Sequence, residues 1–326
     1  MSADLVLGLD GGGTKTVVAL ADRSGAVPAL VRGPGLDPYG NAAWREDLAA
    51  LVAAVAPGPG RLARAALGLS CHTESAAVSA EQADCARRLF AGPVDTLNDV
   101  YVAFTGALAG RAGVLALAGT GSMTWAGDGR GLDRRCGGWG EVVGDEGSGY
   151  WLGREALTET TRWLDGRGRS RAFAEALLAR IGISGGELIG WISGLENRRA
   201  GIAALARTVG DLAAAGEPTA DGLVARAADH LAEQVETAWR SVGAPGPLVW
   251  TYAGGLFAGE ALRRHMAARL GAPRPPELPP VGGAILEAAR RAGWTTDSAW
   301  RARLAASLAG EIRSGGAPEP SAGVTQ

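Results

Sequence analysis

Two turns rich in glycine and threonine contain residue types that suit phosphate binding. The first is DGGGTK at residues 10–15, between the β-type runs LVLGL and TVVALAD, and the second is AGTGS at residues 118–122. Backbone N–H groups in such a turn can bind an anion without a helix dipole. The alternative is a tight hairpin turn, which needs glycine for its conformation. Because the chain contains two such turns, we favour a triphosphate ligand.

The first turn differs from the commoner nucleotide-binding signatures. A Walker A loop carries lysine before its final serine or threonine and leads into a helix, whereas Thr14 stands at the lysine position and TVVALAD is typical of a strand. The dinucleotide-binding fingerprint also leads into a helix. The sequence therefore predicts a β-hairpin that presents amides and the Thr14 hydroxyl.

Carboxylates at two places could carry acid–base chemistry or bind hydroxyl groups. Asp99 follows the strand-like run VDTLN and precedes a helix. It is therefore either a helix N-cap or a base at the carboxyl end of a strand, where open α/β sheets bind ligands. The second place is CGGWGEVVGDEGSGYWLG (136–153), where glycines surround Asp145 and Glu146. Glycine is used where a ligand approaches the backbone closely or φ is positive.

Alternating and helical patterns predict the elements that position these residues. Strands are expected at 5–9, 16–22, 27–31, 64–70, 94–98, 114–119, 123–127 and 248–253. Helices are expected at 42–56, from a capping box at Ser79, and at 100–109, 146–165, 170–181, 198–215, 219–241, 258–270, 282–292 and 298–313. The strand–glycine turn–strand unit occurs once in each half, which predicts two related lobes with a cleft between them.

Composition excludes several classes of protein. The 326 residues are 47% hydrophobic and 20% charged with a net charge of -2, which suits a globular protein of two domains and argues against nucleic acid as a partner. No run approaches the ~20 apolar residues of a membrane span, and the start has no secretory signature. Cys71, Cys85 and Cys136 form no CxxC pair. We therefore expect a reduced, cytoplasmic protein without a membrane or nucleic-acid partner.

Five segments in order resemble the acetate and sugar kinase/Hsp70/actin superfamily. LDGGGTKT and LAGTGS are similar to its two phosphate motifs, LNDVYVA to the motif of the catalytic aspartate, YAGGLFAG to the adenosine motif and VGGAILEA to the connecting helix. The match spans residues 8 to about 290. Within the superfamily, the chain resembles the N-acetylglucosamine kinases and the activating ATPases of benzoyl-CoA reductase and 2-hydroxyacyl-CoA dehydratase.

The resemblance implies a fold and its division. The expected class is α/β, with two actin-like (ribonuclease H-like) lobes, an ATP cleft between them and helical insertions in the second lobe. The lobes would comprise residues 1–113 and 114–313, the last helix being able to pack back on the first lobe, and 314–326 would be a disordered tail. A homodimer is also expected.

The resemblance also implies roles for individual residues. Asp99 would be the general base that accepts the sugar hydroxyl's proton, and Asp10 would hold Mg²⁺ through water. The residues expected to bind the phosphates of ATP are Gly11, Gly12, Gly13, Thr14, Lys15, Gly119, Thr120 and Gly121, and those at adenosine are Gly254 and Gly255. The residues expected at the sugar are Asn41, Asp99, Ser122, Gly138, Trp139, Gly140 and Asp145.

Some interpretations stay open at this point. Asn41 is either a sugar ligand or a helix cap, and Trp139 either packs on a sugar or forms a core wall. Glu146 and Ser148 are expected to start a helix, and Trp151 to lie in the core. The loop Ser70-Cys71-His72-Thr73-Glu74 departs from the kinases' Ser-Gly-rich pattern, which bears on the amino-sugar substituent that is tolerated.

Three functions compete. The first is ATP-dependent phosphorylation of an N-acetylated amino sugar, with N-acetyl-D-glucosamine and its 6-hydroxyl foremost and glucosamine, N-acetylmannosamine or N-acetylmuramic acid as alternatives. The second is an activating ATPase with an iron–sulfur cluster shared between subunits, for which the cysteines are poorly placed. The third is a nucleotide-dependent regulator, against which the complete 136–153 segment argues.

Overall fold

The computed structural model describes residues 3–58, 60–168 and 170–314, so nearly all of the expected tail lies outside the described residues. The chain forms two compact units. The first comprises residues up to Ala109 together with the segment from Glu277 onward, and the second is Gly110–Pro276. The last two helices therefore belong with the N-terminal sheet, although most of the chain between them and that sheet forms the other unit.

The first unit is a five-stranded sheet with helices on both faces. Its elements are β1 (Leu5–Gly11), β2 (Lys15–Asp22), β3 (Ala29–Pro34), α1 (Trp44–Val55), β4 (Leu62–Leu69), α2 (Ala76–Leu89), β5 (Val94–Asn98), α3 (Asp99–Leu108), α10 (Pro280–Arg291) and α11 (Ser298–Ser314). The strand order is β3-β2-β1-β4-β5. The β1–β2 and β2–β3 pairs are antiparallel, and β1–β4 and β4–β5 are parallel.

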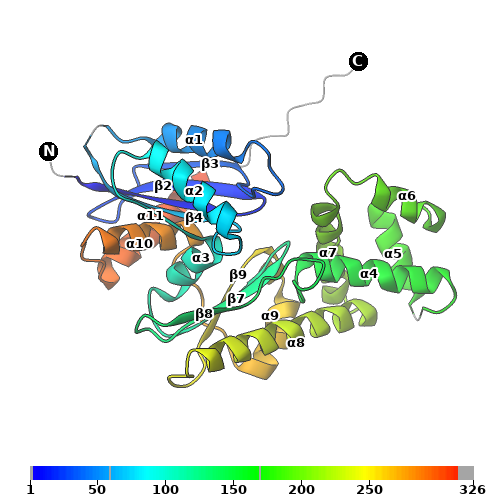
Figure 1. Cartoon of the computed structure of the whole chain (residues 1–326). Helices are drawn as coiled ribbons and strands as arrows, with labels where there is room; N and C mark the ends of the chain where they lie inside the picture. The colour runs from blue at the N-terminus through cyan, green and yellow to red at the C-terminus, as the bar shows by residue number, and fades with distance from the viewer. Residues whose placement is uncertain (1–2, 59, 169, 315–326) are drawn as a thin grey trace, which may run out of the picture. The chain divides into compact units, whose positions relative to one another are not determined.

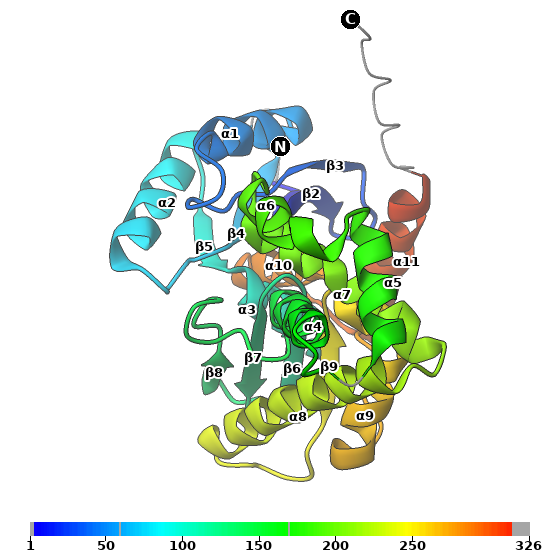
Figure 2. The same ribbon diagram turned by 90° about the vertical axis from the view of Figure 1, so that its right-hand side faces the viewer.

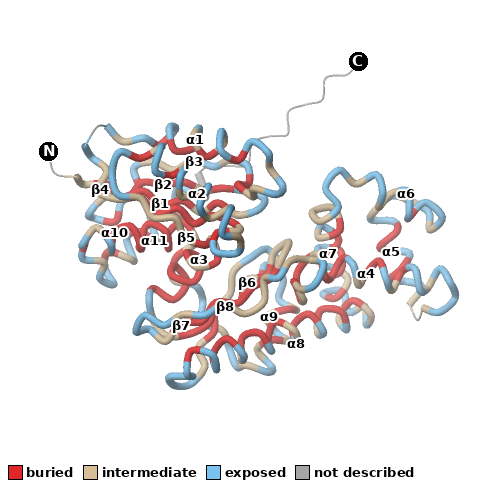
Figure 3. The backbone as a smooth tube through the Cα atoms, in the orientation of Figure 1, coloured by how far each residue is buried: buried red, intermediate tan, exposed pale blue. Residues whose placement is uncertain are grey.

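Alternation along β1 divides the core of this unit between two layers. Leu7 and Leu9 pack in a cluster with Trp44 of α1, whereas Val6 belongs to the cluster with Ile285 of α10. Successive side chains of a strand point to opposite faces, so the apolar run LVLGL at the start of β1 can serve both layers. Figure 1 shows α1 and α2 on one side of the sheet and α10 and α11 on the other, and Figure 3 shows β1 buried.

The second unit contains a four-stranded sheet and most of the helices. Its elements are β6 (Gly113–Ala118), β7 (Ser122–Gly127), β8 (Asp133–Gly137), α4 (Gly149–Leu164), α5 (Arg171–Ile181), the short 3₁₀ helix η1 (Gly185–Glu187), α6 (Leu188–Ser193), α7 (Arg198–Ala214), α8 (Pro218–Ser241), β9 (Trp250–Ala253), the 3₁₀ helix η2 (Gly255–Ala258) and α9 (Glu260–Leu270). Figure 2 shows the long α8 running beneath the strands. Within the described ranges, every helix falls short of the length and apolarity that a membrane crossing requires.

The predicted internal repeat is confirmed. In the second sheet the order is β8-β7-β6-β9, with antiparallel β7–β8 and β6–β7 pairs and a parallel β6–β9 pair. The order β3-β2-β1-β4 in the first sheet follows the same pattern. The two glycine turns thus occupy equivalent places, one between β1 and β2 and the other between β6 and β7.

Several predicted boundaries were wrong. Helix α2 begins at Ala76 behind the N-cap Ser75, whose hydroxyl accepts from the N–H of Val78, so the expected capping box at Ser79 lies inside the helix. Gln82, the fourth residue of that expected capping box, is buried and does not cap the helix. Helix α4 begins after Ser148, and Glu146 precedes it. The sequence interpretation also missed β8 and α6, whose segments are rich in charge and in glycine respectively.

Candidate active site

Asp10 and Asp99 lie at the same edge of the first sheet. Asp10 is the penultimate residue of β1, and Asp99 directly follows β5. Because β1, β4 and β5 run parallel, their carboxyl ends meet at one edge. This is the edge at which open α/β sheets bind ligands. Sequence-distant carboxylates are thereby brought into one electrostatic environment.

The helix-cap alternative for Asp99 is not what the structure contains. Asn98 is the N-cap of α3, its Oδ1 accepting a 2.9 Å hydrogen bond from the N–H of Val100. Asp99 is the first helical residue, and its Oδ1 accepts from the same N–H at 2.8 Å. Burial, followed by the charges of Asp10 and Glu74, raises the pKa of Asp99 to about 7. A carboxyl with such a pKa can take up or release a proton near neutral pH.

Asp10 is in a similar environment. Burial raises its pKa to about 6, and the positive charge of Lys15 opposes that rise. The negative charge of Asp10 in turn raises the pKa of Asp99. A bound cation would stabilise the ionised forms of both carboxyl groups, whose pKa values burial raises.

The first glycine turn lies beside Asp99. The N–H of Gly12 donates to the carbonyl oxygen of Lys15 at 3.2 Å, and the carbonyl oxygen of Gly12 accepts from the N–H of Leu36 at 3.0 Å. A Cβ added at Gly12 would lie 3.9 Å from Oδ2 of Asp99. Gly13, Thr14 and Lys15 are exposed, whereas Gly11 is buried at the end of β1. Exposed backbone in this turn is therefore available to a ligand.

A strained loop, residues 70–74, follows β4 at the same edge. Cys71 and Thr73 have positive φ values of 62° and 69°, which are uncommon for residues other than glycine. The loop is fastened from behind, because Gln82 donates to the carbonyl oxygen of Ser70 at 2.8 Å and contacts Nδ1 of His72 at 2.9 Å. Asn98 also donates to the carbonyl oxygen of His72, at 2.8 Å. These buried contacts hold the loop 70–74, whose sequence differs from the Ser-Gly-rich pattern of the kinases, in a defined conformation.

Asn41 does not act as the N-cap of α1. That position is Ala43, without a side-chain hydrogen bond, and Oδ1 of Asn41 accepts from the N–H of Ala43 at 2.9 Å. Its amide donates to the carbonyl oxygen of Gly35 and to Oδ2 of Asp47, both at 2.8 Å. The side chain is therefore held rigidly just ahead of the helix.

The second glycine turn is anchored to the start of α4. The N–H of Gly149 donates to the carbonyl oxygen of Gly119 at 2.8 Å, and the N–H of Tyr150 to that of Thr120 at 3.1 Å. Gly119 and Thr120 are half-buried. Gly254 has a φ of 98° and packs against Ala118, so a side chain there would overlap β6, while Gly255 is exposed. The predicted phosphate and adenosine segments of this unit thus follow its parallel strands β6 and β9.

The 136–145 segment contacts the second glycine turn, because Asp145 accepts a hydrogen bond from the N–H of Ser122. Trp139 is 68% exposed, which contradicts the core-wall alternative, and its ring lies 5.3 Å from the guanidinium carbon of Arg135. Gly138 and Gly140 have φ values of 73° and 82°. Trp151 is buried, as predicted. An exposed indole beside glycines of positive φ is suited to packing on an apolar ring face.

Asp145 is the buried carboxylate of this segment. It accepts hydrogen bonds from the N–H of Ser122 at 3.4 Å and from Arg199 at 2.7 Å. Ser122 itself is buried, and its hydroxyl donates to the carbonyl oxygen of Glu146 at 2.8 Å. Burial raises the pKa of Asp145, and the charge and hydrogen bond of Arg199 act against that rise. The sequence interpretation missed Arg199, because nothing in LENRRAG marks one arginine as a partner of the distant aspartate.

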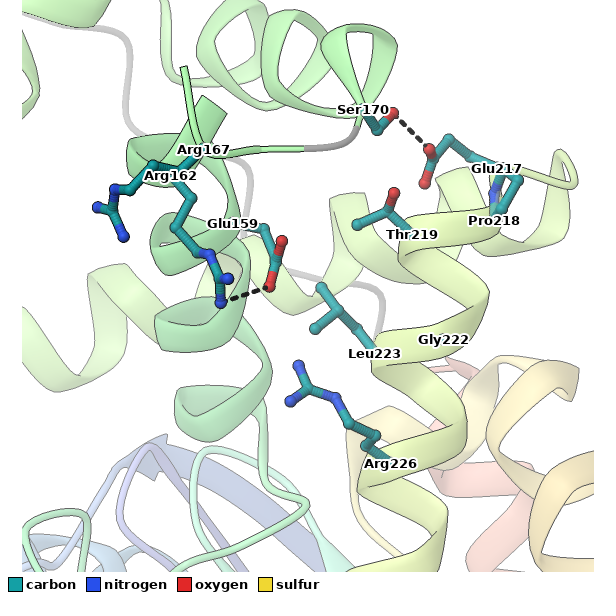
Figure 4. A pocket seen from close by; sticks show the side chains of 10 residues that line it. All are labelled: Glu159, Arg162, Arg167, Ser170, Glu217, Pro218, Thr219, Gly222, Leu223 and Arg226. Atoms are coloured by element: carbon teal, nitrogen blue, oxygen red, sulfur yellow. Dashed lines mark hydrogen bonds and ion pairs between the residues drawn. The ribbon is translucent and has the colours of Figure 1, made fainter. Parts of the chain in front are cut away.

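A separate pocket of about 650 Å³ occurs in the second unit (Figure 4). It lies between the C-terminal half of α4 and the first turns of α8. Ser170 donates to Glu217 at 2.8 Å at one end, and Arg162 lies 4.0 Å from Glu159 at the other. None of the residues predicted for catalysis or binding lines it.

The described carboxylates could supply only some of the ligands of a Mg²⁺ ion. Across residues 3–58, 60–168 and 170–314, no group of three or more His, Cys, Asp and Glu side chains is arranged to hold a metal. Mg²⁺ commonly uses one or two carboxylates together with substrate phosphates and water. Asp10, with its pKa raised by burial, fits that mode.

Comparison with known proteins identifies the family. The model of the BadF/BadG/BcrA/BcrD ATPase family matches residues 7–288. The chain belongs to this family. Its sequence is also 29% identical over 238 residues to an N-acetylmuramic acid/N-acetylglucosamine kinase of Clostridium acetobutylicum, covering 69% of this chain and 76% of the relative.

Solved structures similar to this BadF/BadG/BcrA/BcrD family member have the same architecture. A protein of Chromobacterium violaceum, provisionally described as an N-acetylglucosamine kinase, has a TM-score of 0.72 and 27% identity over 88% of this chain and 99% of its own. A second protein so described, from Porphyromonas gingivalis, has a TM-score of 0.67 and 20% identity over 86% and 97%. The latter likeness shows the fold alone. The predicted α/β fold with two related sheets is confirmed.

Proposed function

We propose that this protein transfers the γ-phosphoryl group of ATP to a hydroxyl group of an N-acetylated amino sugar, foremost the 6-hydroxyl of N-acetyl-D-glucosamine. The observation that carries the proposal is the setting of Asp99. Its carboxyl lies at the ligand-binding edge of the sheet, beside the first glycine turn, with a pKa raised to about 7. The similarity to an N-acetylmuramic acid/N-acetylglucosamine kinase supports the choice of substrate class.

In the proposed reaction Asp99 accepts the proton of the attacking sugar hydroxyl. The hydroxyl oxygen bonds to the γ-phosphorus while the bond from that phosphorus to the β–γ bridging oxygen breaks, and ADP leaves. Amides of the turns at 11–15 and 119–121 bind the phosphates, and Gly254 and Gly255 lie at the adenosine. Asp10 would hold Mg²⁺, through water. When bound, this ion would supply charge neutralisation on the phosphate oxygens. Asn41, Ser122, Gly138, Trp139, Gly140 and Asp145 bind the sugar.

The test is ADP release with Mg-ATP against a panel of sugars. The panel contains N-acetylglucosamine, N-acetylmuramic acid, glucosamine, N-acetylmannosamine, glucose and no sugar, and the phosphorylated position is read by NMR. We expect stimulation by an N-acetylated amino sugar and phosphate on its 6-oxygen. Hydrolysis that is the same with and without every sugar would overturn the proposal and favour an activating ATPase.

A further inference from the structure

The buried carboxylate of Asp145 has few partners. The residue is 2% exposed and has a φ of 56°, a left-handed conformation that Asp tolerates better than most side chains. Among the described residues, its Oδ1 accepts only a long hydrogen bond from Ser122, and its Oδ2 accepts the 2.7 Å bond from Nη2 of Arg199. A buried carboxylate is stable in ionised form only when it is paired or well hydrogen-bonded. Arg199 is therefore the main source of that stabilisation.

Arg199 is held where its own helix does not favour it. It is the second residue of α7, behind the N-cap Asn197. A cation at this end of a helix is disfavoured, because the helix dipole is positive there. Arg199 is instead fixed by acidic partners, since its Nε also lies 3.2 Å from Oε2 of Glu141. Such conflict between local preference and the observed structure is common at functional sites.

This ion pair lies directly against the second glycine turn. A Cβ added at Gly121 would be 2.8 Å from both Nη2 of Arg199 and Oδ2 of Asp145. Ser122, the next residue, bonds Asp145 through its N–H and Glu146 through its hydroxyl. These hydrogen bonds therefore connect α7, the second glycine turn and the segment around Asp145.

We infer that Arg199 is a positioning residue, which keeps Asp145 ionised and orients its carboxylate to accept hydrogen bonds from sugar hydroxyls. The part about the sugar rests on the proposed function, whereas the part about Asp145 does not. The groups that face Asp145 are Arg199 from α7, Glu141 from its own loop and the Ser122 amide. Without Arg199, burial and the charge of Glu141 both favour the protonated carboxyl, which donates one proton and accepts less well.

The first measurement is titration of the Asp145 carboxyl by ¹³C NMR, assigned with Asp145→Asn. In Arg199→Met we expect the pKa of Asp145 to rise by about 1–3 units. In Arg199→Lys, which keeps the positive charge, we expect a pKa close to that of the wild type. Arg199→Gln keeps an N–H donor without the charge and serves if the Met variant does not fold. Arg198→Met, at the exposed neighbouring position, is the matched control. An unchanged pKa of Asp145 in the folded Met or Gln variant would overturn the inference.

The second measurement is the steady-state kinetics of the same variants with saturating Mg-ATP. We expect the KM for sugar in Arg199→Met to rise at least about tenfold with a smaller change in kcat, because binding shared by ground and transition states is lost. Arg199→Lys should recover part of it, and Arg198→Met should match the wild type. A shifted pKa with an unchanged KM would remove Asp145 from sugar binding. A wild type that phosphorylates no sugar refutes the proposed function, and the titration still decides the role of Arg199.

Discussion

Asp95 and Asp99 are four residues apart, but their surroundings move their pKa values in opposite directions. Burial alone would raise the pKa of Asp95, but the hydrogen bond from Arg64 and the charge of Arg291 outweigh it and lower that pKa. Asp99 faces Asp10 and Glu74 instead of arginines, so its pKa is raised to about 7. The same residue type is thus structural in one place and suited to proton transfer in the other.

The first prediction concerns Asp99→Asn. The substitution keeps the shape of the side chain and removes the base, so we expect kcat for sugar phosphorylation to fall by ~10²–10⁴-fold while the fold is retained. Steady-state assays and circular dichroism check this. Asp95→Asn is the matched control, because it breaks the pair with Arg64 and should reduce stability while leaving kcat within a few-fold. Equal loss of kcat in both variants would refute the assignment of the base.

The second prediction concerns pH. Asp99 acts as a base only when ionised, so kcat/KM for sugar should fall as pH drops through the pKa of about 7. Glu74→Gln removes one of the negative charges that raise this pKa, so the acidic limb should move to lower pH. Glu46→Gln, exposed on α1, should leave the limb in place. A limb that stays fixed or moves to higher pH in Glu74→Gln would contradict the electrostatic account.

Residue types and motif order were sufficient to predict the fold and to select the residues proposed for the candidate site, but they did not reveal the contacts that support those residues. Asp99 and Asp145 could be selected because each is embedded in a recognisable motif. Arg199 could not, because its pairing with Asp145 is set by the packing of α7. The helix-cap alternative for Asp99 was wrong, because the cap of α3 is its neighbour Asn98. Asn and Asp have similar capping preferences, and only the backbone geometry separates the two residues.

At the scale of elements, two glycines bring α3 and α10 into backbone contact. A Cβ at Gly106 would lie 2.9 Å from the carbonyl oxygen of Pro279, and one at Gly283 would overlap the carbonyl oxygen of Val102. Helix α3 begins with Asp99, so this contact fixes the element that carries the proposed base. The sequence motif VGGAILEA was assigned as the connecting helix, and the packing of this helix on α3 explains the glycine at position 283.

The third prediction follows from this contact. Gly283→Ala should destabilise the protein by ~1–3 kcal/mol or more, because the added methyl group would meet the backbone of α3, which cannot move away easily. Gly210→Ala is the matched control on α7, where a Cβ would meet none of the described atoms within 4 Å, and it should stabilise by ~0.5–1 kcal/mol. Denaturant unfolding of both variants tests the pair. A neutral Gly283→Ala would disprove the close packing.

Elements were missed where local composition conflicted with tertiary structure. Strand β8 reads DRRCG and is stabilised by pairing with β7, not by an apolar pattern of its own. Helix α6 lies in a glycine-rich segment with low helix propensity. The misplaced start of α2 has a different cause, because Gln82 fits a capping box but is used to fasten residues 70–72.

At the scale of the molecule, the repeat predicts that both units contribute to nucleotide binding. This is the fourth prediction. A non-hydrolysable ATP analogue at 100 times its Kd should stabilise the protein by ~2.7 kcal/mol. This stabilisation is measured as the rise in melting temperature at a fixed analogue concentration. Thr14→Val and Thr120→Val should each reduce that rise, whereas Thr158→Val, exposed on α4, should not. Loss confined to one turn would show that a single unit binds the phosphates. The expected homodimer stays a prediction, to be checked by light scattering.

The first unit is assembled from two stretches of chain with the whole second unit between them. During synthesis, the sheet face that includes Val6, Ala19 and Ala66 is complete long before α10 and α11, which cover it, leave the ribosome. That apolar face stays uncovered while residues 110–276 are made, and its final closure depends on contacts between distant parts of the sequence. Such closure is slow, and an uncovered apolar face is prone to aggregate. The yield of soluble protein in cells should therefore depend on chaperones that bind the nascent N-terminal sheet.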